Sequence, residues 1–377
     1  MNLISRAADL ESFGDWRASL GDLNSSLTAS SELTAEGTNA IENLSAAYVV
    51  EAFEKLGWQW QVGRRFTAWE LMRELGILPR YDRLVLRLLR KFEEDGVVAR
   101  SGIHWVIGAP PKAPSPEQLL AAGERNPQGQ QTVLAVLRAC APSFADALTG
   151  RRSALEVIFP NGDSSLVGAI YNEHPASHIM NRLVRHAFEQ ALPLGERRPH
   201  VLEAGAGTGG TTAYLVDILD RRRCDYVFTD VSPFFLNAAR AKFAGALGMR
   251  FSTLNLDLPP DSQGIQAHWF DVIVAANMLH ACRTVTGALG GVRRMLRPGG
   301  VLLLLETTRA MRWLDLIFGL TDGWWAFSDC RLRSDYPLLS ASSWLGLLPE
   351  CGFGRSFVID NALANQSLFV CRADESA

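Results

Sequence analysis

The second half of this chain alternates regularly between strand-like and helix-like segments, and this alternation constrains the fold more than any other feature. Short apolar runs, separated by segments with helical spacing, occupy residues 200–204, 226–230, 250–256, 270–276 and 300–306. Strands that alternate with helices of this length pair in parallel, so the pattern predicts an α/β fold with a doubly wound sheet. Residues 356–372 contain two apolar runs around a turn, which predicts an antiparallel hairpin at the sheet edge.

The first half of the chain predicts separate, mostly helical units. Residues 1–45 are rich in Ser, Thr and Ala, and we expect a loosely attached leader that is partly disordered or helical. Residues 46–107 contain three segments with helical spacing and then an alternating segment, which together predict a winged helix. Thr67 is the expected N-cap of the second helix. The proline-rich segment 108–118 is an expected linker, and further helices follow it.

Composition excludes several classes of protein. A length of 377 residues is sufficient for two domains, and 47% hydrophobic residues are sufficient for a buried core. The formal net charge of −3 argues against a general nucleic-acid binder, which normally carries a basic excess. We find no apolar run of ~18 residues and no basic-plus-apolar leader, so we expect neither membrane insertion nor secretion. The six cysteines form no CxxC pair, and we expect free thiols in a reducing cytoplasm.

The stretch HVLEAGAGTGGTT joins the first predicted strand to a helix through a glycine-rich turn. Gly205, Gly207 and Gly210 satisfy the G-x-G-x-x-G pattern, so an NAD-dependent dehydrogenase is one alternative. Glu203 argues against it, because a carboxylate beside a diphosphate adds unfavourable charge. S-adenosylmethionine carries an ammonium that such a carboxylate can bind, and its own carboxylate can accept from the N–H groups that open the helix. The glycines would let the backbone approach this ligand closely.

The following strands also end in residues suited to S-adenosylmethionine, and ligands of such sheets bind at the carboxyl ends of the strands. Asp230 can accept both ribose hydroxyls, a role that NAD would also give it. Asp257 is placed to receive the adenine amino group, and backbone groups at Asn277 would flank the methionine portion. The full predicted cofactor site consists of Glu203, Gly205, Ala206, Gly207, Thr208, Gly209, Thr211, Asp230, Val231, Asp257, Leu258, Asn277 and Met278.

Several long blocks resemble the methyltransferase domains embedded in modular type I polyketide synthases. They are HVLEAGAGTGGTT, YVFTDVSPFFLNAAR, AANMLHACR, LRPGGVLLLLETTRAMRWLDLIFGLTDGWWAF and LLSASSWLGLLPECGFG. Similar upstream blocks, YVVEAFEKLGW, LEVIFPNGDSSL and IYNEHPASHIMN, extend the resemblance from residue 46 to the C-terminus. Members of this family usually use S-adenosylmethionine to methylate the α-carbon of a β-ketoacyl chain carried on an acyl carrier protein.

This resemblance implies a Rossmann-like class I methyltransferase with an added domain. The implied parts are an N-terminal, winged-helix-like lid domain over residues 46–165, a methyltransferase core over residues 166–377 and a substrate-pocket insertion at 307–341. The implied partners are the phosphopantetheine-bearing carrier protein and other polyketide synthase domains, with no nucleic acid and no membrane. Arg309 and Arg312 are candidate carrier-docking residues.

The family's catalytic pair implies that His280, after the fourth strand, and Glu306, at the end of the fifth, are catalytic. The fourth and fifth strands are expected to be neighbours, so their carboxyl ends would bring both side chains to one rim. An imidazole has an unperturbed pKa of ~6.5 and is suited to remove a proton from a carbon between two carbonyls. The carboxylate would fix the tautomer of the ring and favour the imidazolium that forms.

Aromatic residues crowd the insertion, and we predict that some of them form a wall of the acyl pocket. The predicted pocket residues are Tyr171, Asn172, Trp313, Trp324, Trp325 and Phe327. Packing of these side chains in a buried core is the alternative, and we expect a mixture of the two.

Other functions remain open. Relatives with similar motifs methylate a β-hydroxyl or enol oxygen, and a His–Glu pair can deprotonate a hydroxyl as readily as a carbon. A winged helix could also belong to a DNA-binding regulator, although charge on a solvated helix face is the more usual explanation. The third helix carries the basic residues Arg80, Arg83, Arg87, Arg90 and Lys91.

A metal site is a further alternative. His174 and His178 are four residues apart and would share one face of a helix, where they could bind a metal. Pro175 lies between them and no third ligand is evident, so we expect no metal.

Overall fold

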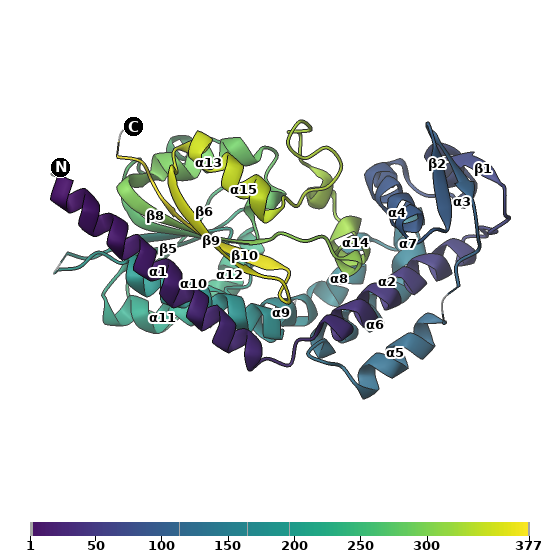
Figure 1. Ribbon diagram of the computed structural model, residues 1–377, viewed down its shortest axis with the longest axis horizontal. Helices are drawn as coiled ribbons and strands as arrows, with labels where there is room; N and C mark the ends of the chain where they lie inside the picture. Colours follow the sequence, from purple (N-terminus) through teal and green to yellow (C-terminus); the bar gives the residue numbers. More distant parts are fainter. Residues whose placement is uncertain (1–2, 113, 164, 196, 376–377) are drawn as a thin grey trace.

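The computed structural model describes residues 3–112, 114–163, 165–195 and 197–375, and it has two lobes (Figure 1). The larger lobe contains a seven-stranded sheet in the order β6-β5-β4-β7-β8-β10-β9. Its strands are β4 (His200–Ala204), β5 (Asp225–Asp230), β6 (Met249–Thr253), β7 (Phe270–Ala276), β8 (Leu296–Thr307), β9 (Arg355–Asn361) and β10 (Gln366–Arg372). The strands from β4 to β8 pair in parallel, and β10 runs antiparallel to β8 and β9. The predicted doubly wound sheet with its C-terminal antiparallel hairpin is confirmed.

Helices cover both faces of this sheet. On one face lie α10 (Pro175–Ala191), α11 (Thr212–Arg221) and α12 (Pro233–Lys242), and on the other lie α13 (Val285–Met295) and α15 (Ala341–Leu347). Within β8, Leu303 packs toward the first layer and Leu304 toward the second, and both are fully buried. Strands covered on both faces need apolar side chains in both directions, which explains the uninterrupted run VLLLL in the sequence.

The smaller lobe contains the predicted three helices and hairpin. Its elements in chain order are α2 (Ala35–Lys55), β1 (Arg65–Thr67), α3 (Ala68–Leu75), α4 (Asp82–Glu94), β2 (Val98–Ser101) and β3 (His104–Ile107). The strands form a small sheet in the order β1-β3-β2, of which only β2 and β3 were predicted. Thr67 is the N-cap of α3, because its hydroxyl accepts from the backbone N–H of Glu70 while the Glu70 carboxylate accepts from the N–H of Thr67. The predicted cap is therefore confirmed.

Five further helices connect the two lobes along the chain. They are α5 (Pro116–Arg125), α6 (Gln131–Cys140), α7 (Phe144–Thr149), α8 (Ala154–Ile158) and α9 (Ser165–Asn172). Gln131–Thr149 is, by length and composition alone, a stretch that could cross a membrane, although the sequence predicted none. More than half of this stretch is buried in the protein, and a buried core helix passes the same test.

The N-terminal segment is helical, one of the two forms expected for it, but its helix packs against the sheet lobe. It forms α1 (Leu3–Ala29), which lies along α10 and β9 (Figure 1). Leu20 is fully buried and Leu27 is 7% exposed in the core that the helix shares with the sheet. The predicted boundary after residue 45 falls inside α2, so this part of the predicted domain division does not coincide with a break between helices.

The insertion packs with the smaller lobe. Its helix α14 (Arg312–Ile317) and its aromatic residues belong to the same hydrophobic core as α2, α4 and α6. A buried polar contact joins the two parts, because Asp315 accepts from Arg87 of α4 at 3.1 Å and from the Tyr336 hydroxyl at 2.8 Å. The insertion therefore joins the carboxyl edge of the sheet to the smaller lobe. The domain boundaries themselves stay predictions.

Candidate active site

The loop between β4 and α11 forms a cradle of glycines. Gly205, Gly207 and Gly209 have φ angles of 59°, 54° and 69°, a region that residues with a Cβ rarely adopt. A Cβ on Gly207 would meet no heavy atom closer than the carbonyl oxygen of Gly205 at 4.0 Å, so it would project into open space. Glycine is needed here both for the backbone conformation and to leave room for a ligand.

Glu203 provides a buried carboxyl group at the end of β4. The residue is 1% exposed, and both the Thr212 hydroxyl, at 2.5 Å, and the Tyr226 hydroxyl donate to its Oε2 atom. Burial raises the pKa of Glu203 to about 7. The carboxyl group borders the cavity described below, where a ligand ammonium would stabilise its ionised form. These residues therefore fit the amino-acid portion of S-adenosylmethionine.

Asp230 lies beside the glycine loop. Its Oδ2 atom accepts from the N–H of Gly207 at 3.0 Å, and its Oδ1 atom accepts from the N–H of Ser232 at 2.8 Å. The residue is 6% exposed, and burial raises the pKa of its carboxyl group. Asp230 thus holds the glycine loop in shape, a role that the sequence did not predict.

Two exposed apolar residues accompany the strand-end acids. Val231 and Leu258 are 59% and 52% exposed, so each offers a free apolar surface next to Asp230 or Asp257. Asp257 accepts from the backbone N–H of Arg283 at 2.7 Å. The predicted contacts of these residues with adenine and ribose stay predictions.

Asn277 ends β7 in an unusual conformation. Its φ angle is 51°, in the left-handed region that Asn tolerates better than most residues. Its Oδ1 atom accepts from both the N–H and the hydroxyl of Thr307, at 2.8 and 2.9 Å. The neighbouring Met278 side chain packs against Gly205. This turn therefore ties the end of β7 to β8 and directs the chain back toward the glycine loop.

His280 and Glu306 meet as the sequence predicts. His280 lies in a short 3-10 turn, Leu279–Ala281, and its Nδ1 atom is 2.6 Å from Oε2 of Glu306 on β8. Oε1 of Glu306 accepts from the backbone N–H of Leu279 at 2.9 Å and of His280 at 3.4 Å. Glu306 is fully buried and His280 is 9% exposed. The carboxylate thus fixes both the imidazole ring and the turn that carries it.

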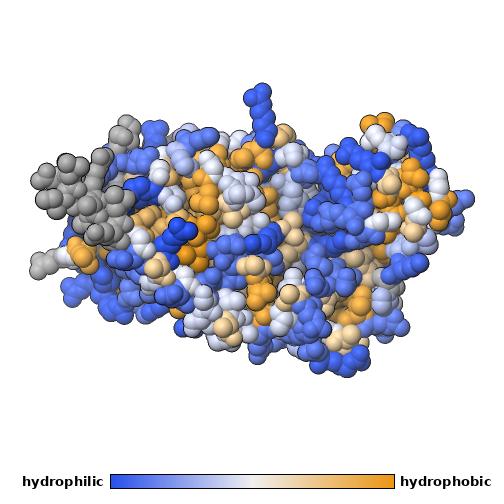
Figure 2. Space-filling view, viewed as in Figure 1, coloured by the Kyte–Doolittle hydropathy of each residue, from blue (hydrophilic) through white to orange (hydrophobic). Residues whose placement is uncertain are grey.

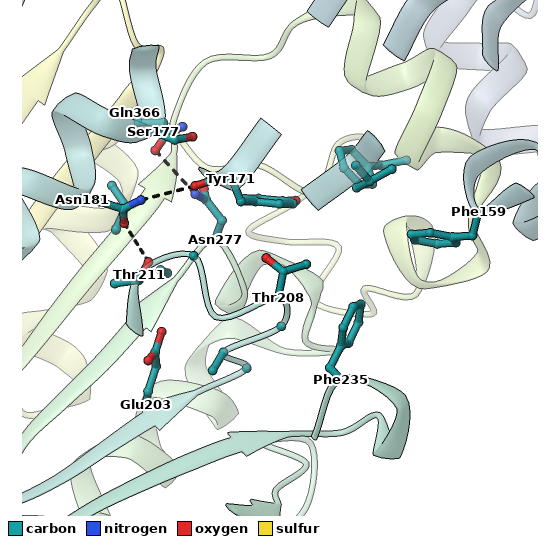
Figure 3. Close-up of a pocket in the computed structure, with 18 residues that line it drawn as sticks. Phe159, Tyr171, Ser177, Asn181, Glu203, Thr208, Thr211, Phe235, Asn277 and Gln366 are labelled. Carbon is teal, nitrogen blue, oxygen red and sulfur yellow. Dashed lines mark hydrogen bonds between the residues drawn. The ribbon is translucent and has the colours of Figure 1, made fainter. Parts of the chain in front are cut away.

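A cavity of about 280 Å³ opens in front of the glycine loop (Figure 3). Of the predicted site residues, those that line it are Glu203, Gly205, Ala206, Gly207, Thr208, Thr211, Asn277 and Tyr171. Those that do not are Gly209, Asp230, Val231, Asp257, Leu258, Met278, Asn172, Trp313, Trp324, Trp325, Phe327, His280 and Glu306. The glycine loop thus borders this cavity directly, whereas His280 and Glu306 do not line it, although Leu305, next to Glu306 in the chain, does.

Several lining residues were not predicted. Ser177 and Asn181 project from α10, and Gln366 projects from the start of β10, at the end of the cavity near Thr211 (Figure 3). Phe159 and Phe235 lie at the opposite end (Figure 3). Two polar residues spaced four apart on the buried face of α10 are a signal that sequence analysis could have used.

The predicted aromatic pocket residues have mixed positions. Trp324 packs edge-on against the His280 ring, with centroids 5.4 Å apart, and it stacks on Phe318, which lines the cavity. Trp325 donates its indole N–H to the carbonyl of Gly319 within the core. The remaining two, Trp313 and Phe327, are buried in that same core. Packing therefore accounts for most of these rings, and Trp324 is the one that contacts the His–Glu pair.

Of the other two predicted pocket residues, Tyr171 lines the cavity and Asn172 does not. Tyr171 lines the cavity, and burial, followed by the nearby Glu306 charge, raises the pKa of its hydroxyl to about 12. The Asn172 amide instead donates to the carbonyl of Gly168 at 2.7 Å, within α9.

His174 and His178 each contact another residue of the protein. The Nδ1 atom of His174 accepts from the N–H of Ala176 and caps α10, while its Nε2 atom contacts Gln130. Burial lowers the pKa of His174 to about 4. His178 contacts the hydroxyl of Tyr214. Within the described residues, no cluster of three His, Cys, Asp or Glu side chains is suited to a metal.

Three arginines of α4 contact the insertion. Arg83 donates to the carbonyls of Trp325 and Phe327, Arg87 pairs with Asp315, and Arg90 pairs with Asp335. Three of the arginines that suggested a DNA-recognition helix therefore contact the insertion within the protein.

The smaller lobe also exposes apolar side chains (Figure 2). Ile103, at the tip of the hairpin between β2 and β3, is 76% exposed.

The two candidate carrier-docking arginines also pair with acidic side chains of this chain. Arg309 donates two hydrogen bonds to Asp360, at 3.0 and 2.7 Å. Arg312 donates two hydrogen bonds to Asp95, each at 2.6 Å. Both guanidinium groups therefore have acidic partners within the chain, which weakens the idea that they receive a carrier protein.

Comparison with known proteins agrees with this geometry. Residues 202–302 match the model of a methyltransferase domain family. The chain is 38% identical, over 292 residues, to the polyketide synthase ThaG of Burkholderia thailandensis, and 35% identical, over 350 residues, to the non-reducing polyketide synthase dpmpA of Macrophomina phaseolina. These alignments cover 74% and 86% of this chain but only 5% and 15% of those proteins.

Solved structures decide the family. The crystal structure of the CurJ carbon methyltransferase superposes with a TM-score of 0.90 and 33% identity, over 97% of this chain and 98% of that one. The chain belongs to the carbon methyltransferase domains of polyketide synthases. The citrinin polyketide synthase CMeT domain is similar as well, with a TM-score of 0.85, 29% identity and 98% coverage of both chains.

Membership of this family answers the question raised by the glycine loop. The family implies S-adenosylmethionine rather than NAD as the cofactor, and binding of its ammonium by Glu203 stays a prediction. The resemblance noted in the sequence and the class I methyltransferase fold are both confirmed.

Proposed function

We propose that this carbon methyltransferase domain transfers a methyl group from S-adenosylmethionine to the α-carbon of a β-ketoacyl thioester on an acyl carrier protein. The observation that carries the proposal is the 2.6 Å contact between His280 and Glu306, close in the chain to Asn277 and Leu305, which line the glycine-bordered cavity. The carrier protein and other polyketide synthase domains are the proposed partners. The six free cysteines agree with a reducing cytoplasm as the proposed location.

The base in this proposal is His280. Because its Nδ1 atom contacts the carboxylate, its N–H is directed to Glu306 and the lone pair of Nε2 is free to accept a proton. Nε2 takes the α-proton, the C–H electron pair moves into an enolate, and the ring becomes an imidazolium. The buried Glu306 carboxylate stabilises that imidazolium, and its second oxygen is held by two backbone N–H groups so that it cannot rotate away.

The cofactor would lie along the glycine loop. Glu203 would bind the ammonium, and the loop of Gly205 to Gly207 would leave room for the ligand. Asp230 would accept from the ribose hydroxyls, and Asp257 would accept from the adenine amino group. When bound, S-adenosylmethionine supplies an electrophilic methyl group on its sulfonium. The chain contributes alignment of the enolate carbon with that methyl group and exclusion of water, which account for much of the rate.

The position of the new methyl group on the acceptor distinguishes carbon methylation from oxygen methylation. We would incubate the protein with labelled S-adenosylmethionine and matched β-ketoacyl and β-hydroxyacyl carrier proteins, and locate the new methyl group by tandem mass spectrometry. The proposal predicts a methyl group on the α-carbon of the β-ketoacyl chain and little transfer to the β-hydroxyacyl chain. A methyl group on oxygen in either acceptor would support the alternative O-methyltransferase.

A further inference from the structure

Arg333 is a buried residue of the insertion that holds the chain segment carrying His280. It is 2% exposed, and its guanidinium donates to the carbonyl of His280 at 2.6 Å, of Cys282 at 2.8 Å and of Arg283 at 3.1 Å. The planar guanidinium has five N–H donors in a fixed arrangement, so one side chain can hold several carbonyls of one turn at the same time. Arg333 contacts the backbone of this turn and does not line the cavity.

Asp329 balances the charge of Arg333 and extends the contact to the next helix. Its Oδ1 atom accepts from Nε of Arg333 at 2.6 Å, and its Oδ2 atom accepts from the backbone N–H of Val285 at 2.9 Å. Val285 is the first residue of α13, where a negative charge is favourable. The Asp329–Arg333 pair therefore fixes the chain from His280 to Val285.

Arg333 is also connected to the smaller lobe. The ring of Phe327 has the guanidinium of Arg333 at 5.1 Å and that of Arg83 at 4.5 Å from its centroid. Arg83, on α4, donates to the carbonyl of Phe327 at 3.1 Å. The position of Arg333 thus depends on contacts from both lobes.

We propose that Arg333 is a positioning residue that keeps the His280 imidazole against Glu306. Without its guanidinium, the buried carbonyls of His280 and Cys282 and the partly buried carbonyl of Arg283 lose their charged donor, and the turn is free to shift. A displacement of about 1 Å at a reacting group can reduce the rate on the order of 10²-fold. This inference rests on the proposed role of His280 as the base, and its test therefore includes a measurement that does not depend on turnover.

The test compares Arg333→Met with Arg331→Met, a control that removes an exposed arginine two positions away. Three quantities are measured: kcat on a β-ketoacyl carrier protein, the Kd for S-adenosylmethionine, and the NMR resonance of the His280 Nδ1 proton, which the short contact with Glu306 shifts far downfield. In Arg333→Met we expect kcat to fall on the order of 10²-fold, the Kd to stay within about twofold, and the resonance to disappear. In Arg331→Met all three should match the wild type.

A folded Arg333→Met protein that keeps both the resonance and the wild-type kcat would overturn the proposal. If Arg333→Met does not fold, the same three quantities are measured in Arg333→Lys. Lysine keeps the positive charge beside Asp329 but cannot hold three carbonyls, so the same losses of kcat and of the resonance are expected. Loss of the resonance in Arg333→Met, together with normal turnover in His280→Ala, would retain the positioning role and reject the proposed base.

Discussion

At the residue scale, two buried carboxyl groups, on strands that flank β7, have different environments. Glu203 receives two neutral hydroxyls on one oxygen, and its burial raises its pKa to about 7. Glu306 receives an imidazole on one oxygen and two backbone N–H groups on the other. The first arrangement leaves a carboxyl group that can respond to an incoming cation, whereas the second leaves one that is already fully engaged.

The raised pKa of Glu203 predicts pH-dependent cofactor binding. An ammonium binds the ionised carboxylate, and the pKa of about 7 means that this form is lost as the pH falls below 7. Isothermal titration calorimetry should therefore show the affinity for S-adenosylmethionine falling roughly tenfold for each pH unit well below 7. In Glu203→Gln the binding should be weaker and nearly independent of pH from about 5.5 to 7. Equal slopes in both proteins would show that Glu203 does not bind the ammonium.

At the element scale, α1 is an integral part of the fold. Leu20 is fully buried against the sheet lobe, so Leu20→Ala should lower the free energy of unfolding by about 2–5 kcal/mol. Ser26→Ala, at an exposed position of the same helix, should change it by less than about 0.5 kcal/mol. Urea denaturation followed by circular dichroism measures both values. Equal stabilities would show that α1 does not need this contact.

The elements differ in how well the sequence predicts them, for physical reasons. The strands β4, β5 and β7 are short buried runs bounded by turns, and the sequence predicted their ends to within one residue. The strands β6 and β8 were also predicted, but β6 ends three residues earlier than expected and β8 begins four residues earlier. The strand β1 has only three residues and depends on its pairing with β3, which no local pattern encodes. The sequence did not predict the burial of α1, because most of its residues are small or polar and its apolar stripe, which includes Leu20 and Leu27, is narrow.

The residues of the candidate site also differ in how well the sequence predicts their positions. The glycine loop, Glu203 and the His280–Glu306 pair follow strand ends that the sequence marks clearly. Ser177, Asn181 and Gln366 enter the cavity from α10 and an antiparallel strand, so their positions depend on the tertiary arrangement. The aromatic residues of the insertion could not be sorted into core and pocket before the smaller lobe was placed against them.

At the scale of the whole molecule, the insertion and the smaller lobe are held together by buried charge. Asp315 is fully buried and pairs with Arg87, so Asp315→Leu should lower the free energy of unfolding by about 3–5 kcal/mol through the charge left without a partner. Asp335→Asn removes a more exposed pair with Arg90 across the same contact and should cost less than about 1 kcal/mol. Similar losses in the two variants would show that the buried pair has no special role.

If the imidazole of His280 removes the α-proton, His280→Ala should abolish methyl transfer. We expect a folded variant that binds S-adenosylmethionine with wild-type affinity but transfers no methyl group to a β-ketoacyl carrier protein, as measured by intact-mass spectrometry. Turnover within a few-fold of the wild-type rate would show that His280 is not the base.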